Sequence, residues 1–127
     1  MTLSPGLRSQ LLTMVERSDT AERAGSGDVP VLATPRLLAL AERATVEAVR
    51  PHLAEGETSV GTRVELEHLA ASAVGDHVQL TAELTGVDGR RLVFAFEARD
   101  LKGTLVGRGT VERTVVDRAR FLARLSR

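Results

Sequence analysis

The chain has 127 residues, 43% of them hydrophobic, which is enough for a real core, so residues 1–127 are expected to form a single domain. Its 17 acidic and 17 basic residues are interspersed and only three residues are aromatic, so nucleic acid is not expected as a partner. The sequence has no cysteine for disulfides, thiolate metal sites or a thiol nucleophile, and no stretch approaches the ~18 apolar residues of a membrane helix, so a soluble cytoplasmic protein is expected.

The first part of the chain predicts a short strand and then a small helix. Residues Leu7–Val15 are assigned to a strand, although their apolar residues fit neither the strand nor the helix period cleanly. Residues Ser18–Gly27 begin with a plausible helix cap and end in small residues, which indicates one turn of helix and a flexible loop. A loop at this place, just before the main helix, could serve as a lid.

A long helix is predicted from Thr34 to Pro51. Thr34 followed by Pro35 is a typical helix start, with the threonine as the cap and the proline at the first helical position. Pro51 ends the helix because its ring clashes with the preceding turn. The Thr34 hydroxyl is either an ordinary cap or a reactive group that a neighbouring base activates.

One acidic residue of this helix lies away from the other charges. On a helical wheel at about 100° per residue, a narrow charged stripe is formed by Arg36, Arg43, Glu47 and Arg50. Glu42 lies roughly 120° from that stripe, on the edge of the apolar face. A carboxylate turned toward a core is costly unless something there uses it, so Glu42 is either the partner of a buried cation or a catalytic acid.

The residues after Thr58 change to strand alternation. Along Thr58–His68, His68 shares the face of Val64 and Leu66, while Gly61 is placed on the opposite face. His68 is therefore the one imidazole predicted to point inward, where it is either a core histidine or an acid–base group. His52 and His77 are both interpreted as solvated.

Three further strands and a terminal helix complete the prediction. Asp88-Gly89 and the turn at 100–103 join three successive strands, and the last of them, Thr104–Val115, has Gly107 and Gly109 as places for a bulge or a close approach. Residues Asp117–Arg127 have apolar residues at helical spacing. An antiparallel sheet with one apolar face needs a cover, and the long helix is the candidate. The predicted fold is therefore α+β, a sheet wrapped around a central helix, as in the hot-dog fold.

Several segments then resemble the hot-dog thioesterases of the fluoroacetyl-CoA thioesterase type. They are Thr34-Pro35 with Glu42, HLAEGETSVGTRVELEHLA (52–70), LTAELTGVDGRRLVFAFEARD (80–100) and GRGTVER (107–113). The resemblance covers roughly residues 30–122 in unbroken order. It implies a catalytic set of Thr34, Glu42 and His68, with Gly61 and Arg113 near the substrate. The family's specialised member has aromatic residues in its lid and central helix, whereas this chain has none before Phe94.

The resemblance further implies hydrolysis of a small acyl-CoA thioester in a cleft between the subunits of a homodimer. Coenzyme A would then be part of the substrate, and no metal or other cofactor is expected. From the residues alone, Gly61 is either a strand irregularity or a place where the thioester approaches the backbone, and Arg113 either packs its stem or binds a substrate anion. Alternatives are a hydratase or dehydratase on the same fold, or a non-catalytic module that binds an acyl group or another small ligand.

Overall fold

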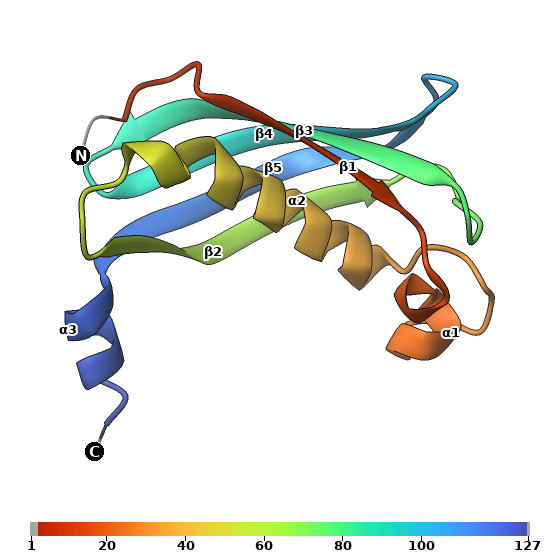
Figure 1. Ribbon diagram of the computed structural model, residues 1–127, viewed down its shortest axis with the longest axis horizontal. Coiled ribbons are helices and arrows are strands. Elements are labelled where there is room, and N and C mark those ends of the chain that lie inside the picture. The colour runs from red at the N-terminus through yellow and green to blue at the C-terminus, as the bar shows by residue number, and fades with distance from the viewer. Residues whose placement is uncertain (1–2, 127) are drawn as a thin grey trace.

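A five-stranded antiparallel sheet wraps around one long helix in the computed structural model, which describes residues 3–126 (Figure 1). The strands are β1 (Arg8–Met14), β2 (Glu57–His68), β3 (His77–Asp88), β4 (Arg91–Asp100) and β5 (Leu105–Asp117). Their order across the sheet is β1-β3-β4-β5-β2, so β2, the first strand after the long helix in the chain, is an edge strand. This is the α+β hot-dog architecture that the sequence predicts.

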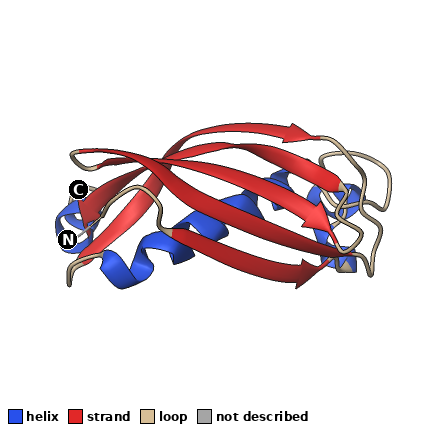
Figure 2. Cartoon of the chain, turned by 90° about the horizontal axis from the view of Figure 1, so that it is seen from above, coloured by secondary structure: helices blue, strands red, loops and turns tan. Residues whose placement is uncertain are grey.

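The long helix α2 (Thr34–Val49) lies across the concave face of the sheet (Figure 2). It contributes a row of small and aliphatic side chains with no measurable exposure, among them Leu37, Ala41 and Ala44. The alanines let the helix lie close to the sheet, whose inward side chains include the fully buried Phe94 and Leu84. The core is therefore the space between α2 and the sheet.

The start of α2 differs from the prediction. Ala33 is the N-cap, Thr34 and Pro35 are the first and second helical residues, and no side chain caps the free N–H groups. The assignment of Thr34 as the cap was wrong by one position, because a threonine before a proline can stand at either place. Its hydroxyl is consequently free for another partner.

Shorter helices flank the core. They are η1 (Arg17–Asp19), α1 (Ala21–Ala24), η2 (Arg50–His52) and α3 (Arg118–Ala123). Asp117 caps α3 by accepting from the backbone N–H of Arg120, and the helix is shorter than the predicted segment. Within residues 3–126, no helix combines the length and the apolar character needed to cross a bilayer.

A bulge in β2 reverses the predicted faces of its first half. Gly61 pairs with Arg113 and Arg63 pairs with Glu112, so Thr62 is an extra residue in β2. Strand alternation restarts after such a residue. The placement of Gly61 on the outer face was therefore wrong: a side chain built there would meet Glu42 on α2. Beyond the bulge the predicted alternation holds, and His68 faces inward.

Neighbouring atoms approach the backbone of β5 closely at its glycines, as the sequence predicts. A Cβ on Gly107 would lie 2.8 Å from Leu37 Cδ2 of α2 and 2.9 Å from the Glu67 carbonyl oxygen. On Gly109 it would overlap the carbonyl oxygen of Glu65. Pairing with β4 also shifts beside Gly107, which leaves Val106 as an extra residue. The second half of β2 can therefore run close to β5.

Candidate active site

Thr34 and His68 meet where α2 begins and β2 ends. Thr34 Oγ1 and His68 Nδ1 are 2.8 Å apart, a hydrogen bond whose donor depends on the imidazole tautomer. The last inward position of β2 brings His68 there, and the free hydroxyl of the first helical residue reaches it from α2. The two residues, 34 positions apart in the chain, form a hydroxyl–imidazole pair.

The other ring nitrogen of His68 forms no hydrogen bond with the described part of the chain. Nε2 is buried, and no hydrogen-bonding group of residues 3–126 reaches it. Burial lowers the pKa of His68, while the Ala70 backbone opposes that shift in part. Near pH 7 the imidazole is therefore neutral, and it can donate one proton and accept another.

A pocket of about 350 Å³ opens beside this pair. Its lining is aliphatic or small apart from Thr34, His68 and Ser26, with Val29, Val31 and Leu32 among the walls. Ser26 and Gly27, from the predicted lid loop, form part of its rim. The loop that precedes α2 therefore forms part of the wall next to the hydroxyl–imidazole pair.

Glu42 lies two turns further along α2 and is held by a buried arginine. Arg113 Nη1 donates to Glu42 Oε2 at 3.0 Å, and the Arg113 side chain is only 8% exposed whereas that of Glu42 is 36% exposed. Arg113 Nε also donates to Ser59 Oγ at 2.9 Å, and Nη2 donates to the Ser59 carbonyl oxygen at 3.1 Å. The guanidinium is thus fixed on three sides, and it orients the carboxylate.

The electrostatics of this pair follow from its unequal burial. Burial lowers the pKa of Arg113, and the charge and hydrogen bond of Glu42 oppose that shift. An arginine stays protonated in a protein even so, so the pair remains ionic. The carboxylate is the more exposed member and keeps one oxygen away from the arginine. It can therefore act on a molecule in the open space beside β2.

Gly61 is the reason that the carboxylate can lie against the backbone of β2. A Cβ at this position would overlap Glu42 Oε2 and lie 3.5 Å from Arg113 Nη1. Any larger residue would displace the carboxylate. Glu42, Gly61, Arg113 and Ser59 therefore form one cluster, named here the carboxylate cluster.

The chain does not bring all of its predicted site residues together. Thr34 and Glu42 are eight residues apart on α2, a rise of about 12 Å. His68 and Gly61 lie toward opposite ends of β2. Each chain thus carries two half-sites, the Thr34–His68 pair and the carboxylate cluster, at separate places between α2 and β2.

Ser59 is the residue of the site that the sequence analysis missed. Nothing in a serine near the start of a strand marks it as functional, and simple alternation gives no reason to connect it with Arg113. Knowledge of the bulge at Thr62 would have pointed to Ser59, because the bulge turns Ser59 and Gly61 toward α2 together. Without a pairing partner for β2, a sequence gives no direct sign of that bulge.

A sheet wrapped around a central helix, with an acid on that helix and a histidine on the next strand, is the arrangement of a hot-dog thioesterase. Residues 15–119 match the family model of the fluoroacetyl-CoA-specific thioesterase FlK. The fluoroacetyl-CoA thioesterase of Streptantibioticus cattleyicolor is 41% identical over 95 residues, which is 75% of this chain and 68% of the relative. The chain therefore belongs to the fluoroacetyl-CoA-specific thioesterase family, as the resemblance implied.

Solved structures agree with this membership. A structure of the fluoroacetyl-CoA thioesterase FlK superposes with a TM-score of 0.90 at 34% identity, covering 98% of this chain and 96% of that one. A thioesterase superfamily member from Thermus thermophilus also gives a TM-score of 0.90, at 30% identity and with 98% and 91% coverage. The fold is thus that of the hot-dog thioesterases, and the chain is a thioester hydrolase.

Proposed function

We propose that this chain hydrolyses the thioester of a small acyl-CoA at a site formed by two subunits of a homodimer. Glu42 and His68 are the reacting groups of this proposal, Thr34 orients His68, and Gly61 and Arg113 hold Glu42 in place. The observation that carries it is the Glu42 carboxylate itself, fixed by a buried arginine against a bare glycine while one side stays open.

The two half-sites of one chain support the dimer. β2 is an edge strand, so one whole side of its backbone is free to pair with another strand. If β2 pairs antiparallel with β2 of a second copy near the middle of the strand, a two-fold axis passes between them. The carboxylate cluster of one subunit then approaches Thr34 and His68 of the partner subunit. Family membership supports the same arrangement, since hot-dog subunits usually pair their sheets.

Glu42 has two chemically balanced roles in this proposal. As a nucleophile, its oxygen attacks the thioester carbonyl carbon, the C–S bond breaks, and water later hydrolyses the resulting anhydride. As a general base, it takes a proton from a water molecule whose oxygen attacks the same carbon. In both cases the leaving coenzyme A sulfur requires a proton. Backbone N–H groups near Gly61 or at the start of α2 would stabilise the oxyanion.

His68 is suited to deliver that proton. If its Nδ1 accepts from Thr34, Nε2 carries the hydrogen, and Nε2 forms no hydrogen bond within residues 3–126. The neutral ring first takes up a proton from the water that is consumed, and the imidazolium so formed, whose pKa burial lowers, then gives a proton readily to the leaving sulfur. Thr34 orients the ring in this scheme, and no metal or cofactor is needed.

The acyl group is proposed to occupy the pocket beside Thr34 and His68. Its volume of about 350 Å³ and its mostly aliphatic walls suit a short acyl chain. The relative from Streptantibioticus cattleyicolor is a fluoroacetyl-CoA thioesterase. The loop before α2 contributes Ser26, Gly27 and Val29 to this pocket, and the chain has no aromatic residue before Phe94, whereas the resemblance places aromatic residues in the lid of the specialised member. We therefore propose a small acyl-CoA without strong selection for fluorine.

A panel of acyl-CoA thioesters with detection of the released thiol tests this proposal. Acetyl-, fluoroacetyl-, propionyl- and longer acyl-CoA are expected to be cleaved with a preference for the short chains. Glu42→Gln and His68→Ala are each expected to lower kcat by about 100-fold or more. If none of these substrates releases thiol above the buffer rate with a folded dimer, a non-catalytic acyl-binding module replaces the thioesterase proposal.

A further inference from the structure

Basic residues gather at the C-terminal end of a chain whose net charge is zero. Residues 118–126 contain Arg118, Arg120 and Arg124 and no acidic residue. Neither Arg120 nor Arg124 forms an ion pair within the described residues 3–126. Guanidinium groups without carboxylate partners are available to an external anion.

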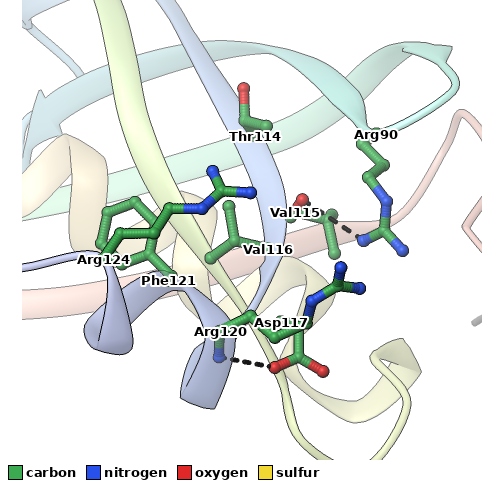
Figure 3. Close-up of a pocket in the computed structure, with 8 residues that line it drawn as sticks. All are labelled: Arg90, Thr114, Val115, Val116, Asp117, Arg120, Phe121 and Arg124. Carbon is green, nitrogen blue, oxygen red and sulfur yellow. Dashed lines mark hydrogen bonds between the residues drawn. The ribbon is translucent and has the colours of Figure 1, made fainter.

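Two of these arginines and a third from the β3–β4 turn surround a pocket of about 290 Å³ (Figure 3). Arg90 is anchored there, because its Nη1 is 3.4 Å from the Val115 carbonyl oxygen and 3.5 Å from Glu57 Oε2. Arg120 and Arg124 come from α3. The hollow bounded by Arg90, Arg120 and Arg124 is called the terminal pocket.

The rest of the terminal pocket is mainly apolar. Val116 lies between the guanidinium groups, and the ring of Phe121 lies beside the stem of Arg124 (Figure 3). Asp117 is the one acidic residue of the lining, and its Oδ1 already accepts from the backbone N–H of Arg120. An aromatic ring and an aliphatic floor under several arginines suit a ligand that combines a flat ring with phosphate groups.

A groove connects this end of the molecule with the carboxylate cluster. It has a volume of about 380 Å³, and its lining includes Val46, one helical turn beyond Glu42, and Ser59 of the carboxylate cluster. The acidic residues of its lining are Glu55 and Glu57. Arg118 also lines the groove, and it directly follows Asp117 of the terminal pocket. A long flexible arm that starts at Glu42 can therefore follow the groove around the end of β2 and β5.

We propose that the terminal pocket binds the phosphorylated adenosine end of coenzyme A, with the pantetheine arm in the groove. Arg120 and Arg124 bind its phosphates, and Phe121 and Val116 contact the adenine. This inference rests on the proposed acyl-CoA substrate, because only such a substrate joins a reacting thioester to a distant nucleotide. It assigns substrate affinity to residues that take no part in the reaction.

A titration of the full chain with adenosine 3′,5′-bisphosphate tests the pocket directly. Calorimetry is expected to show saturable binding that Arg120→Ala/Arg124→Ala weakens by about tenfold or more, since each lost bond is charge-assisted. The control Arg17→Ala/Lys102→Ala removes the same charge from exposed positions elsewhere and should bind as the unchanged chain does. The proposal would be overturned if the bisphosphate does not bind or if it binds equally well to both variants. It would also be overturned if inorganic phosphate binds as strongly as the bisphosphate.

Kinetics then separate this inference from the proposed function. The Arg120/Arg124 variant should raise the KM for acetyl-CoA by about tenfold with kcat unchanged. For acetyl-pantetheine, which lacks the nucleotide, both constants should equal those of the unchanged chain. An equal effect on both substrates would contradict the assignment. If the chain cleaves neither substrate, the proposed function fails, and the titration alone still decides whether the pocket holds the nucleotide.

Discussion

Arg113 donates from Nη1 to Glu42 Oε2 at 3.0 Å, although the two residues are 71 positions apart in the sequence. The two other donations of Arg113, to the hydroxyl and the carbonyl oxygen of Ser59, fix the plane of the guanidinium. Arg113 thereby holds the Glu42 carboxylate of α2 in one position relative to β2. Preorganisation of this kind lets a catalytic acid act without first being ordered.

Arg113→Lys is expected to lower both stability and activity. A lysine keeps the charge but cannot bind Glu42 and both oxygens of Ser59 with one planar group. We expect a loss of about 1–2 kcal/mol in the free energy of unfolding, less than for a fully buried pair because Glu42 is 36% exposed. We expect kcat to fall by about tenfold. Urea unfolding and thiol release measure the two effects, and unchanged kcat would remove Arg113 as the positioning residue of Glu42.

Gly61→Ala should impair catalysis more than folding. The new methyl group would overlap Glu42 Oε2, and the end of that flexible side chain can turn away into solvent. We expect kcat/KM to fall by about 100-fold, as small misplacements of catalytic groups can do. Gly86→Ala is the matched control, since it lies beside another strand bulge and its Cβ would meet Val93 Cβ at an ordinary 3.8 Å. Equal activities of the two variants would contradict the assigned position of Glu42.

Thr34→Ala distinguishes a reactive hydroxyl from a helix cap. Removal of a capping threonine typically costs about 1 kcal/mol of stability. Thr34 is not the cap in this fold, so thermal unfolding should change little, while loss of its hydrogen bond to His68 should lower kcat by about tenfold or more. Thr34→Ser should retain most of the activity. A clear loss of stability with unchanged turnover would return Thr34 to a structural role.

The lowered pKa of His68 predicts a pH dependence of stability. Folded His68 binds its proton more weakly than the unfolded chain does, because burial disfavours the imidazolium. Between the two pKa values the unfolded state binds more protons, so the free energy of unfolding rises with pH through a window below about 6.5 and is fully regained above it.

Urea unfolding at several pH values measures this contribution. His68→Asn should flatten the rise below about pH 6.5 relative to the unchanged chain. His52→Asn is the control, because it removes an imidazole from an exposed position. If both variants give the same profile, His68 does not titrate as its burial implies. The activity of the unchanged chain should fall in the same acidic window if the neutral imidazole is the reacting form.

The fold and part of the candidate site could be predicted from the sequence. Helical spacing singled out Glu42 as the acid away from the charged stripe, and strand alternation turned His68 inward. Both features depend on periodicities within one element. Gly61 was assigned to the wrong face because one extra residue at Thr62 restarts the alternation. Ser59 was missed for the same reason, and both depend on pairing with β5, some 50 residues later.

The separation of the Thr34–His68 pair from the carboxylate cluster also could not be predicted from the sequence. Thr34, Glu42 and His68 look like one set when they are read along the chain. The fold separates Thr34 from Glu42 by about 12 Å on α2. Only the free edge of β2 suggests how a second copy would complete the set.

A mixed dimer tests this shared site most directly. One subunit carries Glu42→Gln and the other carries His68→Ala, and two different tags allow the mixed dimer to be purified after co-expression. Each parent homodimer should be inactive. If Glu42 of one subunit acts with His68 of the partner subunit, one of the two sites in the mixed dimer is intact, and about half of the unchanged activity should return. A mixed dimer as inactive as its parents would contradict the shared site.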